Sequence, residues 1–137
     1  MARLILFGMI LGGVLLPCSG ASYYKTRLED AQAVYLTQDR FAVRADGLAD
    51  DSAGLQAAID KVQETKGEGI LFVPEGRYRV TRTIYVWPGI RVIGYGEKRP
   101  VFLLGDHTPG FQQGIATMFF FAGMRPMQGR GFRLPPP

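Results

Sequence analysis

Residues 69–80 read GILFVPEGRYRV, and this stretch decides between the possible folds. An apolar run, ILFV, is stopped by Pro74 and Gly76. After that stop, Tyr78 and Val80 alternate with arginines. Four or five apolar or alternating residues closed by glycine or proline are typical of a short β-strand. The stretch therefore predicts two short strands separated by a tight corner.

The same pattern continues downstream. Short apolar or alternating runs at 84–86, 90–93, 101–104 and 118–121 are separated by segments rich in glycine and proline. The connections between the early strands are too short for crossover helices, which argues against a βαβ sheet. Two architectures remain: an antiparallel meander or sandwich, and a solenoid whose strands turn corners. A sandwich would favour Asn-Gly or Asp-Gly hairpin turns between strands, but the only Asp-Gly pair, Asp46-Gly47, lies before the helix predicted at 52–65.

Upstream of these strands the sequence predicts one amphipathic helix, Ser52–Thr65. Its apolar residues recur at i, i+3, i+4 and i+7 and so lie on one stripe, while the opposite face is polar. Asp50 or Asp51 can accept hydrogen bonds from the free N–H groups of the first turn, and Gly67 with Gly69 ends the helix. The stripe comprises Leu55, Ala58, Ile59 and Val62, and the polar face comprises Gln56, Asp60, Lys61 and Glu64.

The segment between the N-terminal region and the helix carries weaker signals. Leu28, Ala31 and Tyr35 could line one face of a short helix, or the segment could be an extended arm, and the pattern leaves both open. Phe41 and Val43 alternate with polar neighbours, which predicts a further short strand.

The first residues show the three parts of a secretory signal peptide. Arg3 precedes the unbroken apolar run Leu4–Leu16, and small residues follow. The run is shorter than the roughly 20 residues that a membrane-spanning helix needs. We expect a helical signal peptide cleaved between Gly20 and Ser22, and a secreted protein, extracellular or periplasmic, with no stable membrane span after cleavage. An uncleaved anchor is the alternative.

Composition excludes several classes of protein. Cys18 is the only cysteine in 137 residues, so neither an intrachain disulfide nor a zinc site built on cysteine pairs is possible. The net charge of +4 is spread along the chain, and no aromatic-basic pattern suggests nucleic acid. His107 is expected in a loop beside Asp106. The arginines at 77, 79 and 82 could touch phosphate or an acidic sugar, or form the solvent face of a strand.

Four pieces of the stretch Phe41–Leu104 follow one another in order. They are ADG at 45–47 followed by DDS at 50–52, LQAAID at 55–60, GILFVPEGRY at 69–78 and GIRVIGYG at 89–96. Together they resemble the N-terminal part of the pectate-lyase-like β-helix domain, which also opens rhamnogalacturonase-type, epimerase-like and some β-1,3-glucanase proteins. The chain departs from the family pattern at Ala45, where the opening usually has glycine, and the family's later coils are absent.

The resemblance implies a mainly β fold. It is the start of a right-handed parallel β-helix with an N-terminal capping α-helix, preceded by the signal-peptide helix. Gly76, Gly94 and Gly96 are expected at corners, the last two where no Cβ fits. The expected organisation is a signal peptide at 1–21, an N-terminal arm at 22–40, an incomplete β-helix domain at 41–125 and an irregular Pro/Gly/Arg tail at 126–137. A last coil without a cap predicts marginal stability or aggregation.

The resemblance also implies a polysaccharide partner and a parent protein that is a glycoside hydrolase or lyase. Hydrolysis needs two carboxylates facing one groove, and a lyase needs calcium and a base. Asp46, Asp50 and Asp51 are better explained by turn formation and capping, and Asp106 is the only acidic residue after Leu104.

We therefore expect no catalytic, cofactor-binding or metal-ligating residue and no cofactor, so that the chain alone is inactive. A non-catalytic extracellular carbohydrate-binding or adhesin-like β-helix protein is the alternative. The aromatic residues Tyr78, Tyr85, Trp87 and Tyr95 could stack on sugar rings or fill the coils. The sequence names neither the sugar nor the bond.

Overall fold

The structure, a computed structural model, describes residues 20–124. Almost all of the expected signal peptide and the whole of the expected tail lie outside this range, so both stay predictions. One helix, α1 (Ser52–Lys66), and eight strands make up the described part. The strands are β1 (Val34–Tyr35), β2 (Asp46–Asp50), β3 (Gly69–Pro74), β4 (Arg77–Val80), β5 (Ile84–Val86), β6 (Ile90–Tyr95), β7 (Val101–Leu104) and β8 (Phe119–Phe121).

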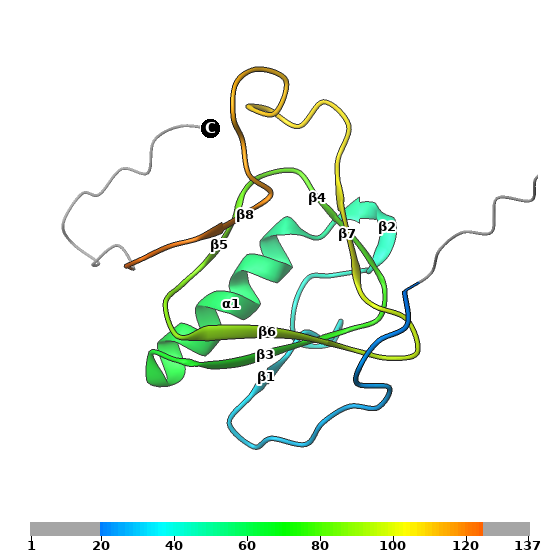
Figure 1. Cartoon of the computed structure of the whole chain (residues 1–137), viewed down its shortest axis with the longest axis vertical. Helices are drawn as coiled ribbons and strands as arrows, with labels where there is room; N and C mark the ends of the chain where they lie inside the picture. Colours follow the sequence, from blue (N-terminus) through cyan, green and yellow to red (C-terminus); the bar gives the residue numbers. More distant parts are fainter. Residues whose placement is uncertain (1–19, 125–137) are drawn as a thin grey trace, which may run out of the picture.

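The strands form three parallel sheets that enclose the core. The sheet orders are β1-β3-β6, β2-β4-β7 and β5-β8, and every pairing between these strands is parallel. Figure 1 shows the sheets as three sides of a triangle. The second coil is β3, β4 and β5, and the last coil is β6, β7 and β8. The solenoid prediction agrees with this topology, and the antiparallel sandwich is wrong.

The register between coils places equivalent side chains above one another. Each residue of β3 has one partner in β6, for example Leu71 with Val92. Because side chains alternate between the two faces of a strand, every second residue points into the triangle. The inward residues of the second coil are all apolar and at most 1% exposed. They are Leu71, Val73, Tyr78, Val80, Ile84 and Val86.

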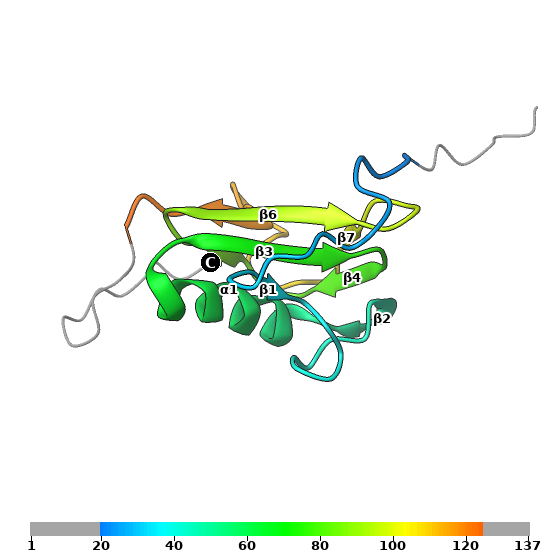
Figure 2. The same ribbon diagram turned by 90° about the horizontal axis from the view of Figure 1, so that it is seen from below.

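Helix α1 forms where the periodicity predicts it. Leu55, Ala58 and Ile59 are fully buried and Val62 is 2% exposed. Figure 2 shows α1 lying to one side of β3 and β6, and the helix contacts β1, β3 and β5. Burial of each large aliphatic side chain stabilises the fold by roughly 1.5–3 kcal/mol, so this stripe is a major part of the core. The helix ends at Gly67 in the left-handed conformation, as expected.

The polar face of α1 is only partly exposed to solvent, because two of its side chains bind the third sheet. The side-chain amide of Gln56 donates to the carbonyl of Tyr85 (3.1 Å) and its oxygen accepts from the N–H of Tyr85 (2.9 Å). The Asp60 carboxylate accepts from the indole N–H of Trp87 (2.6 Å). In the other two sheets, β3 and β4 each pair with an earlier strand, β1 and β2, whereas β5 has no such neighbour. Gln56 forms hydrogen bonds with this free edge of β5 in place of a strand.

Two further expectations about the N-terminal part change. Residues 22–40 contain no helix: they have turns at 31–32 and 38–40 and contribute β1, so the short helix is wrong for this segment. Phe41 and Val43 form no strand; Val43 is nevertheless buried in the core, and the next strand begins at Asp46. Within residues 20–124, no helix combines the length and the hydropathy required to cross a membrane.

The edge pairing by Gln56 predicts a measurable loss of stability. Replacement Gln56→Ala leaves one backbone donor and one acceptor of β5 without their partner, and each such loss costs roughly 0.5–1.5 kcal/mol. We expect the free energy of unfolding, measured by urea denaturation, to fall by about 1–2 kcal/mol. Glu64→Ala, on the exposed side of the same helix, is the matched control and is expected to change it by less than about 0.5 kcal/mol. Equal effects of the two substitutions would contradict the edge pairing.

Candidate functional site

The three aspartates singled out by the sequence lie where the chain enters α1. Asp46 accepts from the N–H groups of Leu48 (2.8 Å) and Ala49 (2.9 Å) and so forms a turn. These two backbone donors hold the pKa of Asp46 below its usual value. The Asp46 carboxylate is therefore ionised at neutral and mildly acidic pH and has no proton to give as a general acid.

Asp50 is held by hydroxyl and backbone donors. It accepts from the N–H of Ser52 (3.0 Å), from the Ser52 hydroxyl and from the hydroxyl of Thr81 (2.6 Å). Partial burial opposes ionisation, but the donors of Ser52 and Thr81 outweigh it and lower the pKa of Asp50. The first-turn capping expected of this residue is confirmed by the bond from Ser52.

Asp51 does not cap the helix with its side chain, so that alternative is wrong. Its fully buried carboxylate points back and accepts from the N–H groups of Arg44 (2.6 Å) and Ala45 (3.1 Å). The backbone N–H of Asp51 donates to the carbonyl of Arg79 (2.8 Å). One residue thus joins the 44–45 loop, β4 and the start of α1. This role is structural.

The aspartates do not assemble a metal site. Among residues 20–124, no group of three or more histidine, cysteine or acidic residues is arranged to hold a metal ion. His107 lies in an exposed turn, as expected for a loop residue. The carboxylates at 46, 50 and 51 serve turn formation and loop attachment.

Ala45 lies in a tight corner beside Asp51, at the position where the resembled opening usually has glycine. Ala45 adopts a left-handed conformation with φ of 55°. Its carbonyl accepts from the N–H of Arg77 (2.9 Å), so the strained residue fixes the start of β4. A Cβ added at Gly76 would lie 2.7 Å from the Cβ of Ala45. The corner is therefore tight on both sides.

The aromatic candidates divide between core and surface. Tyr78 is fully buried and donates to the carbonyl of Pro74 (3.0 Å), and burial raises its pKa well above the usual value. Trp87 is largely buried, and its indole N–H donates to Asp60. The Tyr85 ring stacks on the Trp87 ring, with ring centres 5.9 Å apart. The coil-packing interpretation is confirmed for Tyr78, and Tyr85 stays on the outer face of the third sheet beside half-exposed Phe120.

The outer face of the first sheet is covered by the N-terminal arm. Tyr35 stacks on Phe72 with ring centres 5.3 Å apart, and the edge of Tyr95 completes the row. Near its start the arm also reaches the last coil, because the N–H of Gly96 donates to the carbonyl of Tyr24 (2.9 Å). Along this row the sheet offers no free surface to a ligand.

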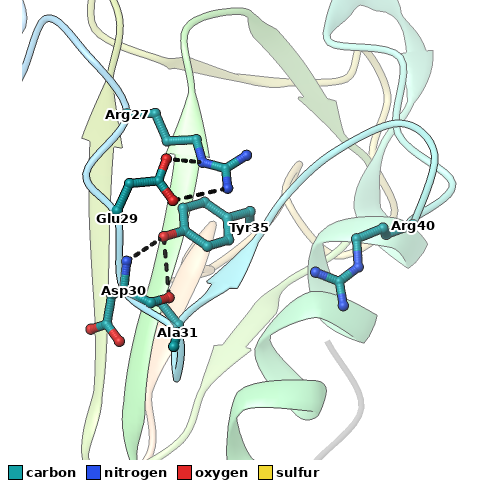
Figure 3. A pocket seen from close by; sticks show the side chains of 7 residues that line it. Arg27, Glu29, Asp30, Ala31, Tyr35 and Arg40 are labelled. Atoms are coloured by element: carbon teal, nitrogen blue, oxygen red, sulfur yellow. Dashed lines mark hydrogen bonds and ion pairs between the residues drawn. The ribbon is translucent and has the colours of Figure 1, made fainter.

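A small pocket lies within that arm (Figure 3). Arg27 and Glu29 form an ion pair (3.3 Å), and the Arg27 guanidinium lies over the Tyr35 ring, 4.1 Å from its centre. The Tyr35 hydroxyl accepts from the N–H of Asp30 (2.8 Å) and donates to the carbonyl of Leu28 (2.7 Å). The pocket has a volume of about 450 Å³. Most of the polar groups around it bind one another, and they hold the first part of the arm against Tyr35 in β1.

A larger open groove, about 830 Å³, lies at the corner between the first and second sheets. Three cationic side chains line it: Arg77 at the start of β4, with Lys98 and Arg99 on the turn before β7. Within the described residues no ion pair involves any of these three cations. The acidic residue in the groove, Glu75, accepts from the backbone N–H of Lys98 (2.9 Å). The Arg99 side chain donates from Nε to the carbonyl of Ala21 (2.8 Å). The groove is therefore open and carries three cationic side chains and one carboxylate.

The sequence pointed to only one residue of this groove. Arg77 belongs to the arginine run at 77, 79 and 82, whereas Lys98 and Arg99 gave no signal of their own. Residue 20, the turn at 75–77 and the turn at 98–102 meet only because the coils stack. The groove residues of adjacent coils lie about 20 residues apart in the sequence, and no local sequence pattern marks them as neighbours. Their proximity could therefore not be predicted from the sequence.

Comparison with known proteins gives two matches. A family model described as "Rhamnogalacturonase A/epimerase, pectate lyase-like" matches residues 39–118, more than half of the chain. A glucan 1,3-beta-glucosidase from Cochliobolus carbonum is 45% identical over 49 residues, which are 36% of this chain and 6% of that protein. The chain thus spans only a small part of the length of this relative. No solved structure matches the chain.

The corner at Ala45 predicts a stabilising substitution. Holding a residue other than glycine in the left-handed conformation costs roughly 1–2 kcal/mol. Glycine avoids this cost, but its greater conformational freedom in the unfolded chain reduces the gain by about 0.5–1 kcal/mol. We expect Ala45→Gly to raise the free energy of unfolding by about 0.5–1 kcal/mol. Gly76→Ala is expected to lower it by about 2 kcal/mol, and by less in the Ala45→Gly background because the facing Cβ is then gone.

Urea denaturation of the two single variants and the double variant measures this coupling. Gly123→Ala is the control, since a Cβ there meets no atom within 4 Å. A destabilising effect of Ala45→Gly, or strictly additive effects of the two corner substitutions, would contradict the geometry of this corner.

Proposed function

Because the chain belongs to the rhamnogalacturonase A/epimerase, pectate lyase-like family, we propose that it forms the N-terminal start of a secreted, polysaccharide-active right-handed β-helix. In this proposal α1 caps the first coil, and the parent protein is a glycoside hydrolase or lyase. The parallel stack, the buried helix stripe and the edge pairing by Gln56 support the capping role. The signal pattern in residues 1–21 supports secretion.

We propose further that these residues bind polysaccharide without cleaving it. Both hydrolysis and elimination need carboxylates that are free to transfer protons or to hold calcium. Asp46, Asp50 and Asp51 instead accept hydrogen bonds from backbone and hydroxyl groups of their own corner. This prior engagement favours a binding and scaffolding role for the chain.

The groove at Arg77, Lys98 and Arg99 carries the proposal about the ligand. Arginine pairs well with carboxylates because its planar group donates two parallel hydrogen bonds. A polysaccharide of uronic acids presents one carboxylate per sugar and would meet several cations at this corner. We therefore assign an acidic polysaccharide as the ligand of the groove.

A neutral β-1,3-glucan is the second candidate. It is favoured by the similarity to the glucan 1,3-beta-glucosidase over 49 residues. Tyr85 and Phe120 on the outer face of the third sheet offer aromatic surface on which an uncharged sugar ring can stack.

The two candidates differ in which substitutions abolish binding. For the chain of residues 20–137, which retains every contact described above, we expect binding to polygalacturonate in affinity electrophoresis that weakens as salt rises. The Arg77→Ala/Arg99→Ala variant is expected to bind about two- to thirtyfold more weakly, since exposed ion pairs contribute roughly 0.2–1 kcal/mol each. Release of new sugar ends is not expected.

Arg82→Ala/Arg91→Ala is the matched control, because both arginines are exposed and lie outside the groove. Unchanged binding by the groove variant would contradict the acidic ligand. Binding to a soluble β-1,3-glucan that is lost in Tyr85→Ala would favour the second candidate instead.

A further inference from the structure

Residues 20–22, where the N-terminal arm begins, lie along the turn that precedes β7. Ala21 forms an antiparallel bridge with Lys98, and the N–H of Ser22 donates to the carbonyl of Glu97 (3.4 Å). Ser22 is only 8% exposed, although the residues on either side of it are exposed. This segment is therefore seated on the turn, at the edge of the groove that Gly20 also lines.

Arg99 is the groove cation that residues 20–22 contact directly. Its backbone N–H donates to the carbonyl of Gly20 (3.3 Å), and its side-chain Nε donates to the carbonyl of Ala21 (2.8 Å). The side chain also follows the backbone of Gly20, because a Cβ added there would lie 3.5 Å from the Cδ, Nε and Cζ atoms of Arg99. Ala21, 78 positions earlier in the chain, thus fixes the orientation of the Arg99 side chain.

The other two cations of the groove have no comparable contact. Among residues 20–124, neither the Arg77 guanidinium nor the Lys98 ammonium group takes part in a hydrogen bond or an ion pair. In Arg99 the Nε–H is occupied, whereas the two terminal nitrogens have no partner in this range. One donor on each terminal nitrogen can bind the two oxygens of a carboxylate in parallel. The contact with Ala21 therefore orients Arg99 and leaves its ligand-binding end accessible.

We propose that Ala21 is a positioning residue of the groove, whose carbonyl holds Arg99 in the orientation in which it binds an anion. This role rests on the acidic ligand proposed above for the groove. An arginine side chain that is free in solution loses rotamer freedom when it binds a ligand, and this loss opposes association. Because Arg99 is already held, ligand binding has one long side chain fewer to order.

The same contact makes the groove depend on how the chain is processed. The expected signal-peptide cleavage between Gly20 and Ser22 can fall on either side of Ala21. A chain that begins at Ala21 keeps the acceptor of the Arg99 Nε–H, whereas a chain that begins at Ser22 lacks it. The two chains carry the same net charge, because each has one α-amino group. The choice of peptide bond thus sets the affinity of the groove without altering its cationic side chains.

Affinity electrophoresis in polygalacturonate tests the proposal with chains that begin at residues 20, 21 and 22 and all end at residue 137. The chains of residues 20–137 and 21–137 are expected to bind equally, and the chain of residues 22–137 about two- to fivefold more weakly. The ordering of one side chain sets the lower figure, and the contribution of one exposed ion pair sets the upper. Far-UV circular dichroism shows whether each chain is folded.

Two arginine variants separate positioning from a general loss of structure. In Arg99→Ala the truncation to residue 22 is expected to leave binding unchanged, because the side chain through which Ala21 acts is gone. In Arg77→Ala, the matched control, the same truncation is expected to keep its full effect, since Arg77 has no hydrogen bond to residues 20–22. The proposal would be overturned by an equal truncation effect in Arg99→Ala, by full binding of the chain of residues 22–137, or by weak binding of the chain of residues 21–137.

Exchange of the Arg99 Nε–H with water, measured by nuclear magnetic resonance without polysaccharide, reports on the contact itself. We expect slower exchange in the chains that contain Ala21 than in the chain of residues 22–137. Equal exchange in all chains would overturn the positioning role whatever the ligand. Absence of binding by every chain would instead contradict the acidic ligand of the groove, and the exchange rates would still decide whether Ala21 holds Arg99.

Discussion

The packing of the helix stripe against the second coil is the interaction on which the rest of the structure depends. A stack of short strands buries its inward side chains only where something lies on both sides of a coil. Leu55, Ala58 and Ile59 provide that cover on one side of β3 and β5 and are themselves fully buried. The polar contacts around the stripe then fix its position: Gln56 holds the edge of β5, and Asp51 holds the entry loop and β4.

This arrangement decides which surfaces remain for a ligand. The arm covers the outer face of the first sheet along the row Tyr35, Phe72 and Tyr95. The corner between the first and second sheets keeps its cations free of ion pairs within the described residues. The third sheet carries Tyr85 and Phe120 outward. The acidic groups near the start of α1 accept hydrogen bonds that stabilise the fold. These structural carboxylates are therefore distinct from the basic groove.

Much of the fold could be predicted from the sequence because its signals are local. The period of the helix stripe, the glycine that ends it and the short apolar runs after it each depend on neighbouring residues, and these elements are found where expected, unlike the strand predicted at Phe41 and Val43. Pairing across coils is not local. Gln56 was assigned only to the polar face of the helix, and its pairing with Tyr85 in β5, 29 residues away, had no local signal. The strand β1 has only two residues, too few for a periodic signal, and is held by β3.

The candidate site was harder to predict for the same reason. The roles of Asp46 and Asp50 could be inferred because their partners are the next few residues of the chain. Asp51 was misassigned because its carboxylate points back seven residues to Arg44. The groove joins Arg77 with Lys98 and Arg99 from adjacent coils, and only the register of the stack brings them together.

The parallel stack is tested most directly by backbone nuclear Overhauser effects in an isotope-labelled sample of residues 20–137. The structure predicts contacts between Leu71 and Val92 and between Tyr78 and Phe102, as in-register parallel neighbours. Contacts that instead join consecutive strands β3 and β4 as an antiparallel hairpin would contradict the stack, and with it the cover provided by α1.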